Sequence, residues 1–271
     1  IIRYANGEIY KGTWKDDQRN GRGIGTFSNG AKYTGSWERG KFDGQGKLIV
    51  PGGEVYVGDW FMGKRDGYGK AVFANKDTYV GLWHRDRVCG NGIMYYCESG
   101  NLYDGKFDNG MRNGLGTLKL KDGGSFRGFF KNGSIHGRGI FRYGNGDIYK
   151  GQFKNGRKEG KGIFKWSNGN EFKGQFRFDK IDGLGNMKYA VGHSYSGEWR
   201  NGKKHGFGKF LFNDGNLYEG FWKSDRRHGR GKFIWNRMQK GSAEYYDGEW
   251  VNDRREGAGK YQYKNGSTFE G

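Results

Sequence analysis

The sequence predicts an all-β fold: an elongated single-layer antiparallel meander of stacked β-hairpins, curved into a half-pipe with an aromatic concave face. Three observations predict it. The 271 residues include 55 Gly and one Pro. An aromatic residue followed by Gly two positions later recurs along the whole chain, and Asn-Gly or Asp-Gly dipeptides punctuate it. Glycine at this density disfavours helices, whereas Asn-Gly and Asp-Gly favour hairpin turns.

The composition excludes several classes of protein. Aromatic residues make up 17% of the chain, too many for a disordered segment. The net charge of +19 attracts anionic partners but does not specify a fold. Cys89 and Cys97 are the only cysteines, which fits a reducing compartment and no disulfide framework. No apolar run is long enough to span a membrane, and no signal peptide is visible.

A repeat of 23 residues organises the chain. The step between successive repeats is 23 residues in nine of eleven intervals, with 24 after Tyr79 and 28 after Tyr218. The longest interval predicts a longer loop at 236–242. Eleven full repeats begin at residues 10, 33, 56, 79, 103, 126, 149, 172, 195, 218 and 246.

The repeats predict one continuous array over residues 1–271. Residues 1–9 match the tail of a preceding repeat, and a twelfth repeat begins at Phe269. We therefore expect this chain to be a fragment of a longer array.

Each repeat predicts two strands. Counting the first aromatic as position 0, Gly follows at position 2 and Trp or Phe at position 4, as in Tyr10, Gly12 and Trp14. A Gly-x-Gly follows seven residues later, as in Gly21 and Gly23, and apolar residues lie four and six positions past its first Gly. Even spacing places these side chains on one face of a strand. The glycines on this face leave room for the rings to lie flat.

These segments resemble the MORN-repeat family, as a scaffold-type member, over nearly the whole chain. The resemblance is carried by Tyr-x-Gly-x-Trp, Asn-Gly-Lys, His-Gly-x-Gly and the closing Asp-Gly or Asn-Gly. It implies an elongated single-layer sheet of stacked hairpins. Choline-binding repeats are also aromatic, glycine-rich hairpins, but their Trp-Tyr-Tyr pattern is missing. The departures from the MORN pattern are Phe in place of Trp at 107, 130, 153 and 176, and Phe in place of Tyr at 126 and 172.

No pattern predicts catalysis, a metal site or a cofactor. His136, His205 and His228 occupy a slot before Gly-x-Gly that other repeats fill with Asn, Asp, Cys or Glu. A slot that accepts all of these indicates a loop position rather than a ligand. The Gly-x-Gly precedes a strand and not a helix, so it does not predict a phosphate-binding loop. We expect that this chain is not an enzyme and that it has no catalytic, cofactor-binding or metal-binding residue.

The aromatic face is a candidate site for a protein partner. A single-layer sheet cannot fully bury its inner face, and exposed apolar surface marks interaction sites. The resemblance implies a peptide or helix in the groove, because some MORN-repeat proteins hold a partner polypeptide there. The candidate groove residues are Tyr103, Phe107, Phe126, Phe130, Tyr149, Phe153, Phe172 and Phe176.

The opposite face is strongly basic in the middle of the chain. Residues 126–200 hold 15 Lys and Arg against 6 Asp and Glu, which is +9 of the total +19. Two interpretations of this basic face remain open. It is either a solvated face that resists aggregation or a docking stripe for an anionic surface. The candidate basic stripe is Arg127, Lys131, Arg142, Lys150, Lys154, Lys165, Lys173, Arg177 and Lys188.

We expect a non-catalytic structural scaffold that organises protein–protein contacts in a cytoskeletal assembly, including a ciliary or axonemal one. The resemblance implies this role, because family members serve in ciliary radial-spoke heads and other cytoskeletal complexes. It also implies a cytoplasmic, cytoskeleton-associated location.

Two other functions stay open. One is a peripheral membrane tether that binds anionic lipids or phosphoinositides through the basic stripe, since each basic residue near such a surface contributes about 1 kcal/mol. The other is the regulatory arm of an enzyme whose catalytic domain lies outside the fragment. Self-association through the array ends is also open. Specific nucleic-acid binding is not expected, because the aromatic and basic side chains lie on opposite faces.

Overall fold

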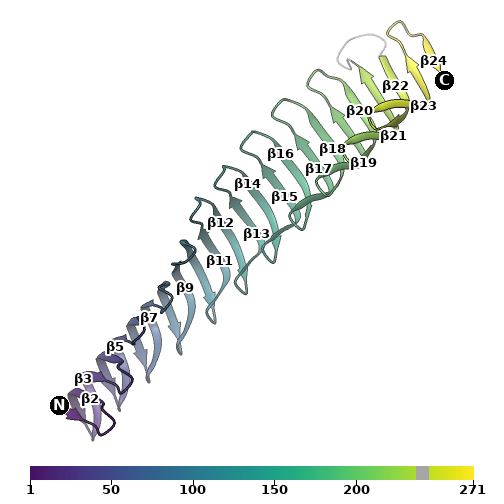
Figure 1. Cartoon of the computed structure of the whole chain (residues 1–271). Helices are drawn as coiled ribbons and strands as arrows, with labels where there is room; N and C mark the ends of the chain where they lie inside the picture. Colours follow the sequence, from purple (N-terminus) through teal and green to yellow (C-terminus); the bar gives the residue numbers. More distant parts are fainter. Residues whose placement is uncertain (236–243) are drawn as a thin grey trace. The chain divides into compact units, whose positions relative to one another are not determined.

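The computed structural model describes residues 1–235 and 244–271, and it divides into two compact units, Ile1–Ile135 and His136–Gly271. Within the described residues every regular element is a β-strand (Figure 1). The longer loop expected at 236–242 lies outside the described residues.

The first unit is a meander in which each strand pairs antiparallel with the next strand along the chain. Its strands are β1 (Ile2–Arg3), β2 (Ile9–Lys15), β3 (Gln18–Thr26), β4 (Lys32–Glu38), β5 (Lys41–Ile49), β6 (Val55–Phe61), β7 (Lys64–Val72), β8 (Thr78–His84), β9 (Arg87–Tyr96), β10 (Asn101–Asp108), β11 (Met111–Lys119) and β12 (Ser125–Lys131).

The second unit repeats this arrangement, again with antiparallel pairing between successive strands. Its first strand, β13, begins at the end of the first unit. The strands are β13 (Ser134–Arg142), β14 (Ile148–Lys154), β15 (Arg157–Lys165), β16 (Glu171–Arg177), β17 (Lys180–Lys188), β18 (Ser194–Arg200), β19 (Lys203–Leu211), β20 (Leu217–Lys223), β21 (Arg226–Trp235), β22 (Glu244–Val251), β23 (Arg254–Gln262) and β24 (Thr268–Glu270).

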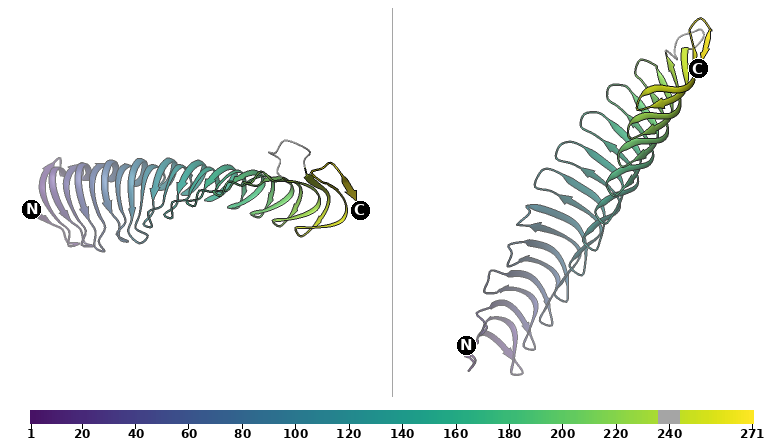
Figure 2. Two further views of the ribbon diagram at one scale, coloured as in Figure 1. Left: turned by 90° about the horizontal axis from the view of Figure 1, so that it is seen from above. Right: turned by 45° about the vertical axis from the view of Figure 1, so that its right-hand side comes forward.

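In each unit the strands form a single layer, and each strand curves around one face of that layer (Figure 2). This confirms the predicted all-β antiparallel meander of stacked hairpins. It also explains the composition, because a single layer has no second sheet or helix against which to bury aliphatic residues.

One kind of turn is the tight hairpin that Asn-Gly predicts. Asn155 and Gly156 join β14 to β15, with φ of 50° and 81°, and Lys154 pairs directly with Arg157. Both turn residues are left-handed, which is the geometry that matches the twist of the flanking strands.

The other kind of turn is longer, and it holds the five dipeptides that the sequence predicts as hairpin turns: Asn29–Gly30, Asn145–Gly146, Asn168–Gly169, Asp214–Gly215 and Asn265–Gly266. The Tyr143 N–H donates to the Asp147 carbonyl oxygen at 2.9 Å, and the Asp147 N–H donates to Asn145 Oδ1 at 3.0 Å. Only Gly146 of the Asn145–Gly146 dipeptide is left-handed, with φ of 89°. The Asn side chain therefore stabilises the loop as an Asx turn.

The histidine slot lies inside a strand, which corrects the predicted loop position. His136, His205 and His228 fall within β13, β19 and β21. In β19 the register shifts at this point, because Trp199 pairs with Lys204 while Gly197 pairs with Gly208. A bulge absorbs the extra residues without ending the strand, and this is why the slot tolerates many residue types.

The core is the aromatic layer on the inner face. Tyr195 is 1% exposed and meets Trp199 and Trp222 edge-on, with ring centroids 5.0 and 5.5 Å away. Its hydroxyl donates to the Glu198 carbonyl oxygen at 2.9 Å. The ring lies flat over Gly208, where an added Cβ would be 2.3 Å from Tyr195 Oη. Glycine is required at this position because the ring occupies the space of a side chain.

Candidate partner-binding groove

The eight candidate groove aromatics form the floor of the inner face rather than an accessible surface. In the first unit Tyr103, Phe107, Phe126 and Phe130 are at most 4% exposed. The other four are equally buried in the second unit, at most 5% exposed: Tyr149, Phe153, Phe172 and Phe176. Edge-on packing of each position-0 ring against its position-4 neighbours leaves no free ring face. These residues can support a binding surface but offer a partner little direct contact.

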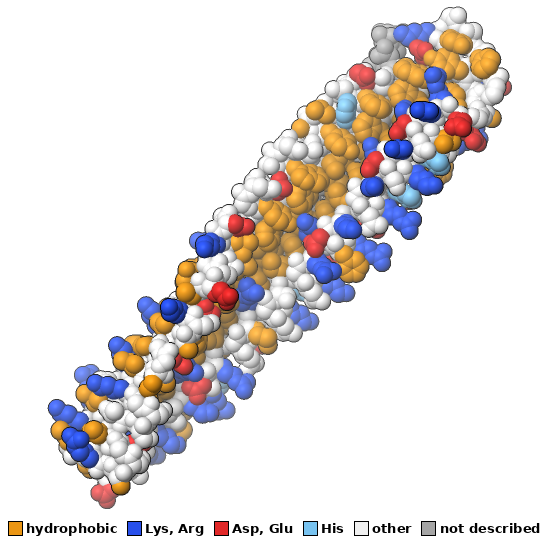
Figure 3. Space-filling model, viewed as in Figure 1, with side chains coloured by type: hydrophobic (Ala, Val, Ile, Leu, Met, Phe, Trp, Pro, Cys, Tyr) orange, Lys and Arg blue, Asp and Glu red, His pale blue; other side chains and the backbone are white. Residues whose placement is uncertain are grey.

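A second set of aromatic side chains is accessible in the second unit. We call these half-buried residues, each at position 17 of its repeat, the rim aromatics. Trp166 and Phe212 each pack against a buried ring at position 15 of the same repeat. The ring centroids of Trp166 and Phe164 are 4.6 Å apart, and those of Phe212 and Phe210 are also 4.6 Å apart. Figure 3 shows the resulting band of apolar side chains along the hollow of this unit. The rim aromatics are Tyr143, Trp166, Tyr189, Phe212 and Trp235.

The equivalent positions of the first unit are less aromatic: Phe27, Val50, Phe73, Tyr96 and Leu120. Even spacing already placed the rim aromatics on the inner face. The sequence analysis did not select them, because spacing defines the face of a side chain but not its depth on that face.

The groove also contains basic side chains that the sequence analysis missed. We call these residues, each at position 9 of its repeat, the groove cations. Each is paired across the hairpin with the position-4 aromatic, as Lys204 is with Trp199. The sequence contained a signal for these residues, because in each of these repeats Lys or Arg lies five residues after the position-4 aromatic. The groove cations are Arg19, Arg65 and Arg112 in the first unit, and Lys158, Lys204, Arg227 and Arg255 in the second.

The groove cations lie over aromatic rings, where cation–π attraction stabilises them. Lys204 Nζ is 4.4 Å from the Trp222 ring centroid and 4.7 Å from that of Phe210. Burial among these rings lowers the pKa of Lys204 below its ordinary value, and Asp225 opposes this only in part. The Lys204 ammonium is therefore a partly desolvated charge facing the groove.

The candidate basic stripe lies on the outer face, and all nine of its side chains are exposed. Arg127 and Lys131 belong to β12 of the first unit, and the other seven to β13–β17 of the second. On the second unit Lys150 and Lys173 both pair with Ile163 of the strand between them. Basic and apolar side chains thus alternate across this part of the face.

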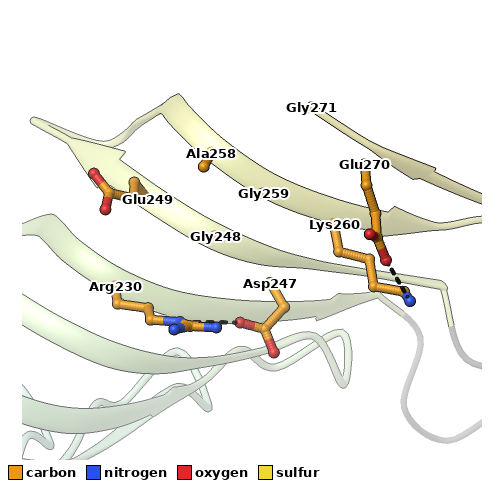
Figure 4. A pocket seen from close by; sticks show the side chains of 9 residues that line it. All are labelled: Arg230, Asp247, Gly248, Glu249, Ala258, Gly259, Lys260, Glu270 and Gly271. Carbon is orange, nitrogen blue, oxygen red and sulfur yellow. Dashed lines mark ion pairs between the residues drawn. The ribbon is translucent and has the colours of Figure 1, made fainter.

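A shallow pocket at the end of the second unit is lined mainly by charged side chains and glycines. It is lined by β21–β24 (Figure 4). Arg230 Nε lies 3.9 Å from Asp247 Oδ1, and Lys260 Nζ lies 2.6 Å from Glu270 Oε1. The two cations of the pocket are thus paired with carboxylates, while Glu249, which also lines it, forms no ion pair within the described residues.

Among residues 1–235 and 244–271, no three His, Cys, Asp or Glu side chains are grouped so as to hold a metal ion. Cys89 and Cys97 are free thiols. The described residues include no helix long and apolar enough to cross a membrane.

Comparison with solved structures finds low-level likenesses. The TCP domain of SAS-4 from Drosophila melanogaster, in complex with a proline-rich motif of Ana2, is 15% identical, with 56% of this chain and 82% of that chain covered and a TM-score of 0.36. The TCP10c domain of Sas-4 from the same organism is 16% identical, with 67% and 94% covered and a TM-score of 0.26. At these values neither carries an argument about function. Comparison with curated proteins finds no match.

The family comparison is decisive. The model of the MORN repeat matches eleven consecutive segments, at residues 10–32, 33–55, 56–78, 79–100, 103–125, 126–148, 149–171, 172–194, 195–217, 218–237 and 246–268. These starts coincide with the predicted repeats. The MORN repeat is a non-catalytic module that serves in protein and membrane interactions. Both the repeat geometry and this match show that the chain belongs to the MORN-repeat family.

Proposed function

We propose that this chain is a non-catalytic scaffold that organises protein–protein contacts, and that a partner polypeptide binds in the groove of the second unit. The observation that carries the proposal is the row of half-buried rim aromatics above a fully buried aromatic floor. Binding energy at protein interfaces concentrates in aromatic residues that sit in well-packed surroundings. The floor holds the rim rings in place, so little conformational entropy is lost on binding.

The dimensions of the groove suit a polypeptide. Successive rim aromatics from Tyr143 to Trp235 are two strands apart, which is about 10 Å at 4.8 Å per strand. The row therefore spans roughly 40 Å, the length of a helix of about 25 residues. A small molecule would contact only one or two of these rings.

We further propose that the scaffold works in a cytoskeletal assembly, including a ciliary or axonemal one. Family membership supports this location, because some MORN-repeat proteins serve in radial-spoke heads. A cytoplasmic site also fits the two free thiols.

Peptides selected from a random library on the immobilised protein should bind through the rim aromatics. We expect Trp166→Ala with Phe212→Ala to weaken their affinity by about 30-fold, since the loss of the two aromatic contacts costs about 1 kcal/mol each. Fluorescence anisotropy measures this.

The matched control removes two aromatics from the outer face, Phe207→Ala with Phe221→Ala. Their rings are exposed and 5.6 Å apart, and their loss should leave affinity within twofold. Groove binding would be contradicted if both variants lost affinity equally. It would also be contradicted if the selected peptides bound the rim variant as tightly as the unchanged protein.

A second candidate function is attachment to an anionic membrane surface through the outer face. It is favoured by the exposure of all nine stripe residues, of which only Lys165 forms an ion pair within the described residues, with Glu171 at 2.8 Å. The two functions can coexist, because they use opposite faces.

Flotation with phosphoinositide-containing vesicles at about 0.15 M salt tests this attachment. Changing Lys150, Lys154 and Lys173 to Glu should abolish flotation, since each basic residue contributes about 1 kcal/mol. The control reverses three outer charges of the first unit: Lys32, Lys47 and Lys70. If both variants lose flotation equally, the attraction is generic and the stripe is no membrane site.

A further inference from the structure

At position 9, cations alternate with apolar residues from Arg19 to Lys204, whereas the three successive repeats that carry Lys204, Arg227 and Arg255 are all basic there. In the first unit Arg19, Arg65 and Arg112 are separated by Phe42 and Val88 at the intervening position 9. In the second unit Lys158 and Lys204 are separated by Ile181. The fold accepts an apolar residue at this position, so packing alone does not require the cations found there.

Some groove cations have a carboxylate partner and others have none. Arg19 pairs with Glu8 at 3.3 Å, and Arg65 with Glu54 at 3.1 Å. Arg227 pairs with Asp253 at 3.1 Å. Among the ion pairs of the described residues, none involves the remaining groove cations, which are Arg112, Lys158, Lys204 and Arg255.

The two unpaired lysines of the second unit face the rim. Lys158 Nζ lies 5.0 Å from the Phe164 ring centroid and donates to the Tyr143 hydroxyl at 3.2 Å. Lys204 has the ring environment described above, with no hydrogen bond from Nζ to a carboxylate within the described residues. A partly buried ammonium that forms no ion pair is costly, so an incoming carboxylate would be stabilised at each.

The spacing of these lysines identifies the class of ligand. Lys158 and Lys204 lie on β15 and β19, four strands or about 19 Å apart. Phosphate recognition usually draws several donors to one group, which this separation prevents. A nucleic-acid strand carries a phosphate at every nucleotide, far more densely than one charge in 19 Å. The apolar floor and rim between the lysines require an apolar surface on the ligand.

We propose that the groove of the second unit selects acidic amphipathic polypeptides, in which separate carboxylates pair with Lys158 and Lys204 while the apolar side chains between them pack on the rim aromatics. This inference rests on the proposed function and adds the chemical class of the partner. A helix of about 13 residues, or an extended segment of about six, covers the distance between the two lysines.

The test uses three labelled peptides of about 24 residues, long enough as a helix to span both lysines. One is an amphipathic Leu/Ala/Glu sequence, and the other two replace every Glu by Gln or by Lys. At about 0.15 M salt we expect the Glu peptide to bind at least tenfold more tightly than the Gln peptide, and the Lys peptide to bind least.

Matched variants locate the selectivity. Lys158→Met with Lys204→Met should weaken binding of the Glu peptide at least tenfold and leave that of the Gln peptide unchanged. Lys154→Met with Lys173→Met removes the same charge from the outer face and should change neither by more than twofold. Arginine at 158 and 204 should restore binding, which separates lost charge from misfolding.

Two outcomes would overturn the proposal. Equal losses from the inner and outer methionine variants would assign the preference to the net charge of the chain. Equal affinity for the Glu and Gln peptides, or no binding of the Glu peptide, would show that the groove does not select acids. If library peptides still depend on Trp166 and Phe212 in that case, the proposed function stands and only its acidic selectivity fails.

Discussion

Raising the pH from 10 towards 12 should unfold the chain steeply. Nine tyrosines occupy position 0, and burial raises the pKa of each above its ordinary value of 10.0; for Tyr103 the pKa reaches about 12. The nine are Tyr10, Tyr33, Tyr56, Tyr79, Tyr103, Tyr149, Tyr195, Tyr218 and Tyr246.

The sign follows from proton linkage. Above pH 10 the unfolded chain releases phenolic protons that the folded chain retains, so the free energy of unfolding falls as pH rises. The contribution is fully present below pH 10 and is lost as pH rises through the raised folded pKa values. Because the tyrosines share one aromatic layer, ionising one of them weakens the packing of its neighbours.

Parallel titrations of far-ultraviolet circular dichroism and tyrosinate absorbance measure this effect. The chain has 18 tyrosines, and the part of the absorbance change that belongs to the nine position-0 rings should coincide with the loss of the circular dichroism signal. Phe126 and Phe172 already fill position 0 with full burial, so Phe is the natural control. Replacing Tyr149, Tyr195 and Tyr218 by Phe should move the alkaline transition upward, at a neutral-pH cost of about 1 kcal/mol per lost hydrogen bond. Ionisation of all 18 tyrosines with the strands intact would contradict the prediction, because the position-0 rings would then be accessible to solvent.

Gly208→Ala should destabilise the hairpins around it by about 2–3 kcal/mol, at the upper end of overpacking penalties. The new Cβ would lie 2.3 Å from Tyr195 Oη and 2.5 Å from its Cζ. Tyr195 cannot move aside, because Trp199 and Trp222 hold it from both sides. Hydrogen exchange at β18–β20 is the suitable measurement, since stability in repeat proteins is local.

A double-mutant cycle supplies the control. In a Tyr195→Ala background the ring is gone, so Gly208→Ala should cost at least about 1 kcal/mol less than it does alone. Additive costs would contradict the contact between this ring and the glycine, and would assign the effect to the backbone of β19.

The sequence alone was sufficient to predict the class of fold, the repeat boundaries and the inner face. Even spacing determines which side of a strand a residue faces, and Tyr10, Gly12 and Trp14 show this within one repeat. Asn-Gly and Asp-Gly dipeptides such as Asn145–Gly146 predicted where the chain turns, but not that these turns are longer than a two-residue hairpin. Both rules depend on local geometry, which is why they hold without knowledge of the neighbours. The choice of basic stripe and of cellular location stays a prediction.

Only the tertiary structure decided which inner-face residues a partner could reach. Tyr149 and Trp166 share a face, yet the first is buried and the second half-buried. Depth depends on the curvature of the strands and on the rings of neighbouring hairpins, and these contacts lie 20 or more residues apart in sequence. The same holds for Lys204, which is one of many lysines in the sequence. Its distinct character comes from Trp222 and Phe210, brought over it by packing between successive hairpins.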